Sequence, residues 1–275
     1  MRIFYICRRV PFPPDRGDKI AAFNEIRHLA AQHEMHVFCL GDGVQDLANI
    51  SGLQAYAMSV TAAPVDEFTI KLRALAALFT GQPLSVAALN EMKLHDAIQK
   101  KFAELRPDLI IVYSCNMAQF AVHFPEVPRV MHFGDLDSLK WRQYAERSSI
   151  PLNWIYAVEA QRLLGYERHV AKISSHALVH TEIEKDDFGR LIPGIPVTVV
   201  GNGVDLDYFR SAGGKRNRDR WYLPESWIAA RTSMPSSGSA TRSCRLFRRK
   251  SRRRISRSAA VDLRRRCADW PNAAV

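Results

Sequence analysis

Apolar residues in the first 200 positions recur with two alternating periods. Short β-rich runs at 3–7 and 109–113 are typical of strands, and the second is apolar throughout, as in a strand buried on both faces. Between them, residues 19–33 carry apolar side chains at helical spacing. We expect further strands at 35–40, 57–61, 129–133, 177–180 and 197–200, and further helices at 67–79, 91–104, 153–173 and from 182 onward, with another that runs to 147. This alternation predicts an α/β fold, a Rossmann-like doubly wound parallel sheet with helices on both faces.

The loop after the first strand is a candidate binding site, because ligands of such sheets bind beyond the carboxyl ends of the strands. It ends in Arg16, Gly17, Asp18 and Lys19, where the first helix begins. Gly17 allows a ligand to approach the backbone, and Arg16, Lys19 and the helix amides favour an anion or a sugar. The simpler alternative is a tight loop with Asp18 as the helix N-cap. No GxGxxG or GxxxxGK[ST] motif is present, which disfavours dinucleotide and P-loop sites.

A second candidate follows the strand at 109–113. Tyr113, Ser114 and Asn116 offer a phenol, a hydroxyl and an amide that can hold sugar hydroxyls at the end of a strand. A cap of the next helix by Ser114 or Asn116 explains these polar residues nearly as well.

The segment after the strand at 129–133 is the most informative. It gathers two carboxylates, an ammonium and an indole, in Asp135, Asp137, Lys140 and Trp141. Asp135 is the better candidate for catalysis or for binding a hydroxyl. Alternatively, Asp137 or Ser138 caps the next helix and Trp141 anchors the core. We infer no metal from this DxD pair, because it precedes a helix in a doubly wound pattern.

Histidines and glutamates elsewhere have simpler interpretations. Thr181 and Glu184 form a capping-box pattern at the start of the helix from 182. His180 either faces the crevice or is a satisfied core histidine. Five histidines elsewhere show no zinc-ligand spacing, namely His28, His33, His95, His123 and His169.

Charge is distributed unevenly along the 275 residues, of which 47% are hydrophobic. The formal net charge is +11, but residues 211–275 hold 17 basic and 4 acidic residues, which leaves 22 basic and 24 acidic residues before them. The five cysteines form no CxxC pair, and no apolar run attains the roughly 18 residues of a membrane span. We expect free buried thiols in a soluble cytoplasmic protein, with peripheral contact at the inner face of a membrane left open.

Five segments together resemble glycosyltransferase family 4, and most of all the sugar transferases associated with exosortase/PEP-CTERM exopolysaccharide systems. They are PFPPDRGDK, the turn at 79–85, RPDLIIVYS, FGDLDSLKWRQYA and VVGNGVDLDYF, and they cover about residues 1–210 in order. The resemblance implies a GT-B fold, in which an acceptor-side domain and a nucleotide-sugar domain face each other across a cleft. It implies transfer from a nucleotide-diphosphate sugar to a lipid-linked or polysaccharide acceptor, with no cofactor, no metal and no nucleic-acid partner.

Individual residues match the motifs of that family. The resemblance implies that Asp135 and Asp137 are catalytic. We expect substrate to be bound by Arg16, Gly17, Asp18, Lys19, Ser114, Lys140, Asn202 and Gly203. Arg16 and Ser114 are expected from their strand-end loops, and the others match motifs of the family, Asn202 and Gly203 in an NGVD hinge that leads into the donor domain.

The donor domain expected after residue 210 has no counterpart, since residues 211–275 lack its Gly-rich turn and its ExxxxxxxE pair and show no apolar period. One interpretation is a basic arm for nucleic acid or anionic membrane, and hence a non-catalytic binding protein whose salt-sensitive binding vanishes when the chain is cut after residue 210. The other is a shifted reading frame. Residues 221–235 can be back-translated so that the frame shifted by two bases encodes VFTGIMDCRPNVDA, and residues from 236 so that it encodes VIWFCDEILP. Because these strings resemble the start of a donor domain, we favour the shifted frame and expect little or no transferase activity.

Overall fold

The computed structural model describes residues 1–202. The chain divides into two compact units, residues 1–208 and 209–275, and the second lies outside the described residues. The predictions for Gly203 and for the basic segment therefore concern parts of the chain beyond this description.

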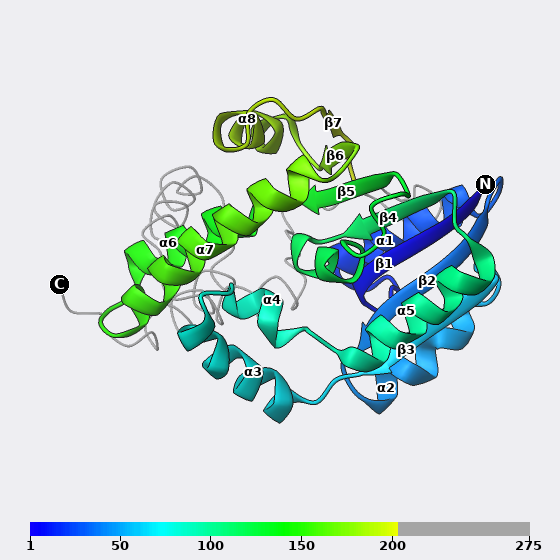
Figure 1. Ribbon diagram of the computed structural model, residues 1–275, viewed down its shortest axis with the longest axis horizontal. Coiled ribbons are helices and arrows are strands. Elements are labelled where there is room, and N and C mark those ends of the chain that lie inside the picture. Colours follow the sequence, from blue (N-terminus) through cyan, green and yellow to red (C-terminus); the bar gives the residue numbers. More distant parts are fainter. Residues whose placement is uncertain (203–275) are drawn as a thin grey trace, which may run out of the picture. The chain divides into compact units, whose positions relative to one another are not determined.

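A seven-stranded sheet, parallel throughout, forms the centre of the first unit (Figure 1). The strands are β1 Arg2–Arg9, β2 Glu34–Gly41, β3 Ser59–Pro64, β4 Leu109–Tyr113, β5 Arg129–Gly134, β6 His176–Val179 and β7 Val197–Val199. Their order is β3-β2-β1-β4-β5-β6-β7, so the chain moves outward on one side from β1 and on the other from β4. The predicted α/β, Rossmann-like doubly wound sheet is confirmed, and its topological switch point lies between β1 and β4.

The long helices match the predicted ranges to within a few residues. They are α1 Gly17–Leu29, α3 Glu67–Thr80, α5 Met92–Leu105, α6 Asp137–Arg147, α7 Leu152–Lys172 and α8 Glu182–Leu191. Four short elements were not predicted, namely α2 Val44–Ala48, η1 Asn49–Leu53, α4 Leu84–Ala88 and η2 Cys115–Phe120. Each has five or six residues, too few to establish a helical period.

Side chains of β1 alternate between the two faces of the sheet, and each face has its own core. Phe4 and Ile6 belong to a cluster with apolar residues of α5, α7, α8 and η2. Ile3 and Tyr5 belong to a second cluster with α1 and η1. In β4, residues 110–113 are all buried, as the uniformly apolar pattern of this strand predicts.

Two buried glutamates on α7 hold the first turns of two other helices. Glu159 accepts hydrogen bonds from the Ser85 amide at 2.9 Å and the Ser85 hydroxyl at 2.6 Å, and from the Leu84 amide, at the start of α4. Glu167 accepts hydrogen bonds from the amide and hydroxyl of Ser138 in the first turn of α6. Both glutamates have 0% of their surface exposed, and a carboxylate near helix N-terminal amides is electrostatically favourable. The longest helix therefore sets where α4 and α6 begin.

Cys7, Cys39 and Cys115 are buried and free, as expected for them, whereas Cys244 and Cys267 lie beyond residue 202. Cys7 and Cys39 are neighbours in the β1–β2 register. The pKa of the Cys7 thiol is raised well above its usual value by its hydrogen bond with Cys39 and by burial. No helix within residues 1–202 combines the length and the apolar character needed to cross a membrane.

Candidate functional site

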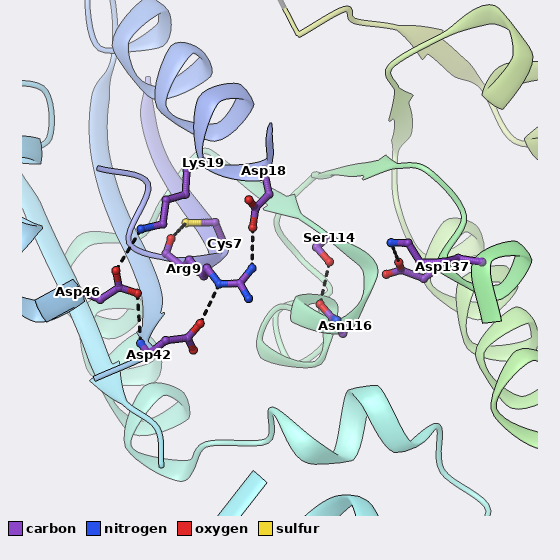
Figure 2. A network of polar contacts seen from close by, with 10 residues as sticks. Cys7, Arg9, Asp18, Lys19, Asp42, Asp46, Ser114, Asn116 and Asp137 are labelled. Atoms are coloured by element: carbon purple, nitrogen blue, oxygen red, sulfur yellow. Dashed lines mark hydrogen bonds and ion pairs between the residues drawn. The ribbon is translucent and has the colours of Figure 1, made fainter. Parts of the chain in front are cut away.

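Polar side chains from four different strand ends gather at the carboxyl edge of the sheet, next to the switch point (Figure 2). We call them the strand-end cluster: Arg9, Asp18, Lys19, Asp42, Asp46, Ser114, Asn116, Asp137 and Lys140. They lie at or after the carboxyl ends of β1, β2, β4 and β5; in the sheet these strands are neighbours in the order β2-β1-β4-β5. The sheet order thus places together residues that lie more than a hundred positions apart in the sequence.

Arg9 joins the start of α1 to the loop after β2. Its Nη1 donates to Asp18 Oδ2 and its Nε donates to Asp42 Oδ2, both at 2.8 Å. Burial lowers the pKa of Arg9, but the hydrogen bonds to Asp42 and Asp18 outweigh that effect and the net shift is upward. Charge-assisted bonds of this kind are short and directional, so they favour one arrangement of these three side chains.

Lys19 was predicted to bind substrate, and the structure pairs it with another side chain. Its Nζ lies 3.0 Å from Asp46 Oδ1, and only 6% of the residue is exposed. Asp46 also accepts a hydrogen bond from the Asp42 amide at 3.3 Å. A ligand would have to displace Asp46 to use this ammonium fully, so the predicted role of Lys19 stays a prediction.

The expectation that Asp18 caps α1 is wrong. The helix begins at Gly17, its N-cap residue is Arg16, and no side chain caps it. The Asp18 carboxylate instead pairs with the Arg9 guanidinium, a stronger partner than a neutral amide. Gly17 has no atom within 4 Å of where a Cβ would lie, so the protein itself leaves space there for the predicted approach of a ligand. Arg16 is exposed at the same turn.

Ser114 adopts a left-handed backbone conformation with φ of 79°. Its hydroxyl donates to Asn116 Oδ1 at 2.8 Å, and its amide donates to the His132 carbonyl at 2.9 Å. Ser114 precedes η2 but makes no side-chain capping bond, so the capping alternative is wrong for it. A non-glycine residue in this region costs about 1–3 kcal/mol and such strain is concentrated at functional sites, which is compatible with the substrate-binding prediction.

The carboxylates after β5 are close together and share one lysine. Lys140 Nζ lies 3.2 Å from Asp137 Oδ1 and 3.8 Å from Asp135 Oδ2. Burial raises the pKa of Asp137, and the charge of Lys140 opposes that rise. Asp135 is more open, with 57% of its side chain exposed against 27% for Asp137. Asp137 is therefore the half-buried member of the pair, and Asp135 is the one that solvent contacts freely.

The structure decides between the alternatives for the start of α6 and for Trp141. The N-cap residue of α6 is Leu136, without a side-chain capping bond, so neither Asp137 nor Ser138 caps the helix as one expectation had it. Ser138 is engaged by Glu167, which leaves Asp137 free to turn toward Lys140. Trp141 packs against the core and against Tyr156, with ring centroids 5.3 Å apart, so its anchoring role is confirmed.

A chain of aromatic and titratable side chains lies behind this edge, and three of its members, Tyr5, Glu25 and His132, were not predicted. Tyr5 donates to Glu25 Oε2 at 2.7 Å, and Glu25 Oε1 lies 2.6 Å from His132 Nδ1 without hydrogen-bond alignment. The Tyr113 hydroxyl lies 3.2 Å from His180 Nε2, and burial raises the pKa of Tyr113. His180 thus lies partly buried beside β4 and β5. For the members that were not predicted, the sequence signal was a histidine inside the apolar run of β5.

The other predicted residues lie at the start of α8 and at the end of the described part of the chain. Thr181 and Glu184 form the predicted capping box at the start of α8. Asn202 is exposed and is the last described residue, while Gly203 lies outside the description. Within residues 1–202, no group of three or more His, Cys, Asp or Glu side chains is placed to hold a metal ion. A cavity of about 560 Å³ lies between α6 and α7, and none of the predicted site residues lines it.

No family model and no curated protein sequence matches the chain. Among solved structures, it is similar to sucrose-phosphate synthase from Thermosynechococcus elongatus, with 11% identity, a TM-score of 0.48, and coverage of 76% of this chain and 50% of that one. A UDP-glucosyltransferase from Polygonum tinctorium has 13% identity, a TM-score of 0.43, and coverage of 73% and 52%. UGT2 from Phytolacca americana has 13% identity, a TM-score of 0.44, and coverage of 73% and 53%. The chain spans about half the length of these proteins, and at such values no residue role is transferred from them.

Proposed function

We propose that residues 1–210 are the acceptor-side half of a GT-B glycosyltransferase of family 4, acting in exopolysaccharide or cell-envelope synthesis of the exosortase/PEP-CTERM type. The intact enzyme transfers a sugar from a nucleotide-diphosphate sugar to a lipid-linked or polysaccharide acceptor. The observation that carries the proposal is the Asp135, Asp137 and Lys140 group at the end of β5, one strand from the switch point. The same segment carries the sequence resemblance.

In this proposal the strand-end cluster and Asp135 bind the acceptor. Asp137 accepts a hydrogen bond from the acceptor hydroxyl, and its raised pKa brings it nearer to the working range of a general base. Lys140 holds that carboxylate in place, and Asp135 binds a second hydroxyl from the solvent side. Carboxylate and amide groups that already sit in hydrogen-bonded positions bind sugar hydroxyls without large rearrangement.

Departure of the nucleoside diphosphate requires helix N-termini and basic residues that stabilise its charge, and the proposal assigns these to a donor domain after residue 210. We propose that the gene, or its sequence, carries a frameshift near the codons for Ala212 to Trp221. The 275-residue chain then binds acceptor but transfers no sugar. A cytoplasmic enzyme at the inner membrane face would meet a lipid-linked acceptor there.

The test compares two proteins. The 275-residue chain is examined by saturation-transfer NMR with free disaccharides and with a shortened polyprenyl-diphosphate glycoside, and contact with the sugar rings is expected. The product of the resequenced, frame-corrected gene is assayed for release of nucleoside diphosphate from UDP-, GDP- and dTDP-sugars. If neither protein binds or uses a sugar, the proposed function is wrong. Sugar transfer by the 275-residue chain would instead show that it lacks nothing essential.

A further inference from the structure

Arg8 is the extra residue of a β-bulge at the carboxyl end of β1. In the parallel register Cys7 pairs with Cys39 and Arg9 with Leu40, so Arg8 has no partner residue on β2. On the other side of β1, the pairing with β4 ends at Ile6. A bulge turns a side chain out of the regular alternation, and bulges are frequent next to active sites.

Within residues 1–202, the guanidinium of Arg8 has no hydrogen-bond or ion-pair partner. Its Nε is buried away from solvent, with no acceptor among these residues. The neighbouring cations differ in this respect, because Arg9, Lys19 and Lys140 are each paired with aspartates. A buried donor without an acceptor is unfavourable, and a bound oxygen would remove that cost.

The charge of Arg8 is also poorly compensated. Burial lowers its pKa, and the nearby charge of Arg9 lowers it further. Asp18, Asp42 and Asp137 act in the opposite direction from both sides of β1, but the first two are bonded to Arg9 and the third to Lys140. Among the described residues, Arg8 is thus a cation near both acidic groups of the strand-end cluster, and no carboxylate forms an ion pair with it.

We propose that Arg8 binds an oxyanion, a phosphate or carboxylate group of the ligand that occupies the strand-end cluster. A guanidinium presents donors in a planar fork that matches the two oxygens of either group. The inference rests on the proposed function and deepens it, since it makes the ligand an anionic glycan or a sugar carried on a diphosphate. In this proposal the charged group of the ligand binds at the end of β1, and its hydroxyls bind at the end of β5.

The experiment measures binding alone, with the full 275-residue chain and three probes: inorganic pyrophosphate, orthophosphate and glucuronate. The Arg8 Nε–H resonance is assigned by its loss in Arg8→Gln and followed in ¹⁵N NMR titrations, which distinguishes it from the arginines after residue 210. The Arg9 amide serves as the common reporter in wild type, in Arg8→Gln and in a control, Arg147→Gln. Arg147 is an exposed arginine in the last turn of α6, and its replacement changes the net charge equally.

Saturable shifts of the Arg8 Nε–H are expected with pyrophosphate or with glucuronate, and which of the two binds more tightly identifies the source of the oxyanion. Arg8→Gln should weaken binding at the Arg9 reporter by about tenfold or more, and Arg147→Gln by less than about twofold. Arg8→Gln should melt no lower than wild type without ligand, because the guanidinium makes no bond. No shift with any probe, equal weakening by both variants, or a lower melting temperature of Arg8→Gln would each overturn the proposal. Sugar binding measured with neutral disaccharides is independent of these outcomes, so failure here leaves the proposed function standing.

Discussion

Two pairs of carboxylates in this protein have opposite surroundings. Glu159 and Glu167 on α7 are fully buried, and between them they accept hydrogen bonds from three backbone amides and two hydroxyls. Asp135 and Asp137 after β5 share one lysine and keep part of their surface in solvent. The glutamate oxygens accept hydrogen bonds from protein donors in place of water. The aspartate oxygens still have acceptor positions that no protein donor uses.

This difference in burial and hydrogen bonding indicates two roles. The buried carboxylates stabilise the fold, and the partly exposed ones are available to a ligand. Removing a partner from a fully buried acceptor set leaves donors unsatisfied, which costs about 1–3 kcal/mol for each group. Removing a partly exposed carboxylate lowers the free energy of unfolding only slightly, because water then contacts the groups that it contacted. Changes at the glutamates should therefore affect stability, and changes at the aspartates should affect binding.

The largest effect is expected for Glu159→Ala. Two amides and a hydroxyl at the start of α4 lose their acceptor, so the free energy of unfolding should fall by roughly 3–5 kcal/mol. Urea unfolding followed by circular dichroism measures this. Glu146→Ala, at an exposed glutamate of α6, is the matched control and should change stability by less than about 0.5 kcal/mol. Equal effects of the two substitutions would mean that the α7–α4 contact carries no stability.

A pH dependence of up to about 3 kcal/mol is expected from Glu167. Burial raises its pKa to about 7, against the opposing hydrogen bonds from Ser138. Because the folded protein holds this proton more tightly than the unfolded chain does, the stabilisation is full below about pH 4.5 and is lost as the pH rises through 7. The stability of wild type minus that of Glu167→Gln should thus decline between pH 5 and 8. A difference that stays constant over this range would contradict the raised pKa.

Asp137→Asn should leave the fold nearly intact and impair binding. Burial disfavours its charge, so a neutral amide of the same shape should change the free energy of unfolding by less than about 1 kcal/mol. Affinity for the acceptor sugar, measured by NMR titration, should fall about tenfold, since a charge-assisted bond to the hydroxyl is lost. A large loss of stability with unchanged affinity would place Asp137 with the glutamates.

The smallest effect on stability is expected for Asp135→Asn, whose carboxylate is 57% exposed and 3.8 Å from its nearest cation. The melting temperature should shift by no more than about 1–2 °C, in accordance with a surface pair worth well under 1 kcal/mol. Sugar affinity should fall less than in Asp137→Asn. If Asp135→Asn weakens binding more strongly, the roles proposed for the two aspartates are reversed.

Local patterns predicted much of this architecture. The strand at 109–113 was predicted to the residue, and the long helices to within a few residues, because apolar periodicity depends only on near neighbours. The same patterns identified Asp135, Asp137 and Lys140 as a group, since these three lie within six positions of one another. Short helices such as α4 fell below the length at which a period can be recognised.

The sequence by itself determined the parallel α/β fold and the strand-end loops that carry polar residues. Only the tertiary structure decided which of those residues are already paired. Arg9 meets Asp42 from 33 positions away and Glu159 meets Ser85 from 74, pairings that depend on the sheet order and on the path of α7. In the part of the chain that the structure describes, Arg8 lies without a partner at a bulge that the apolar pattern did not predict. Charge pairing between distant residues follows from where strands and helices end in space, and that information is absent from periodicity along the chain.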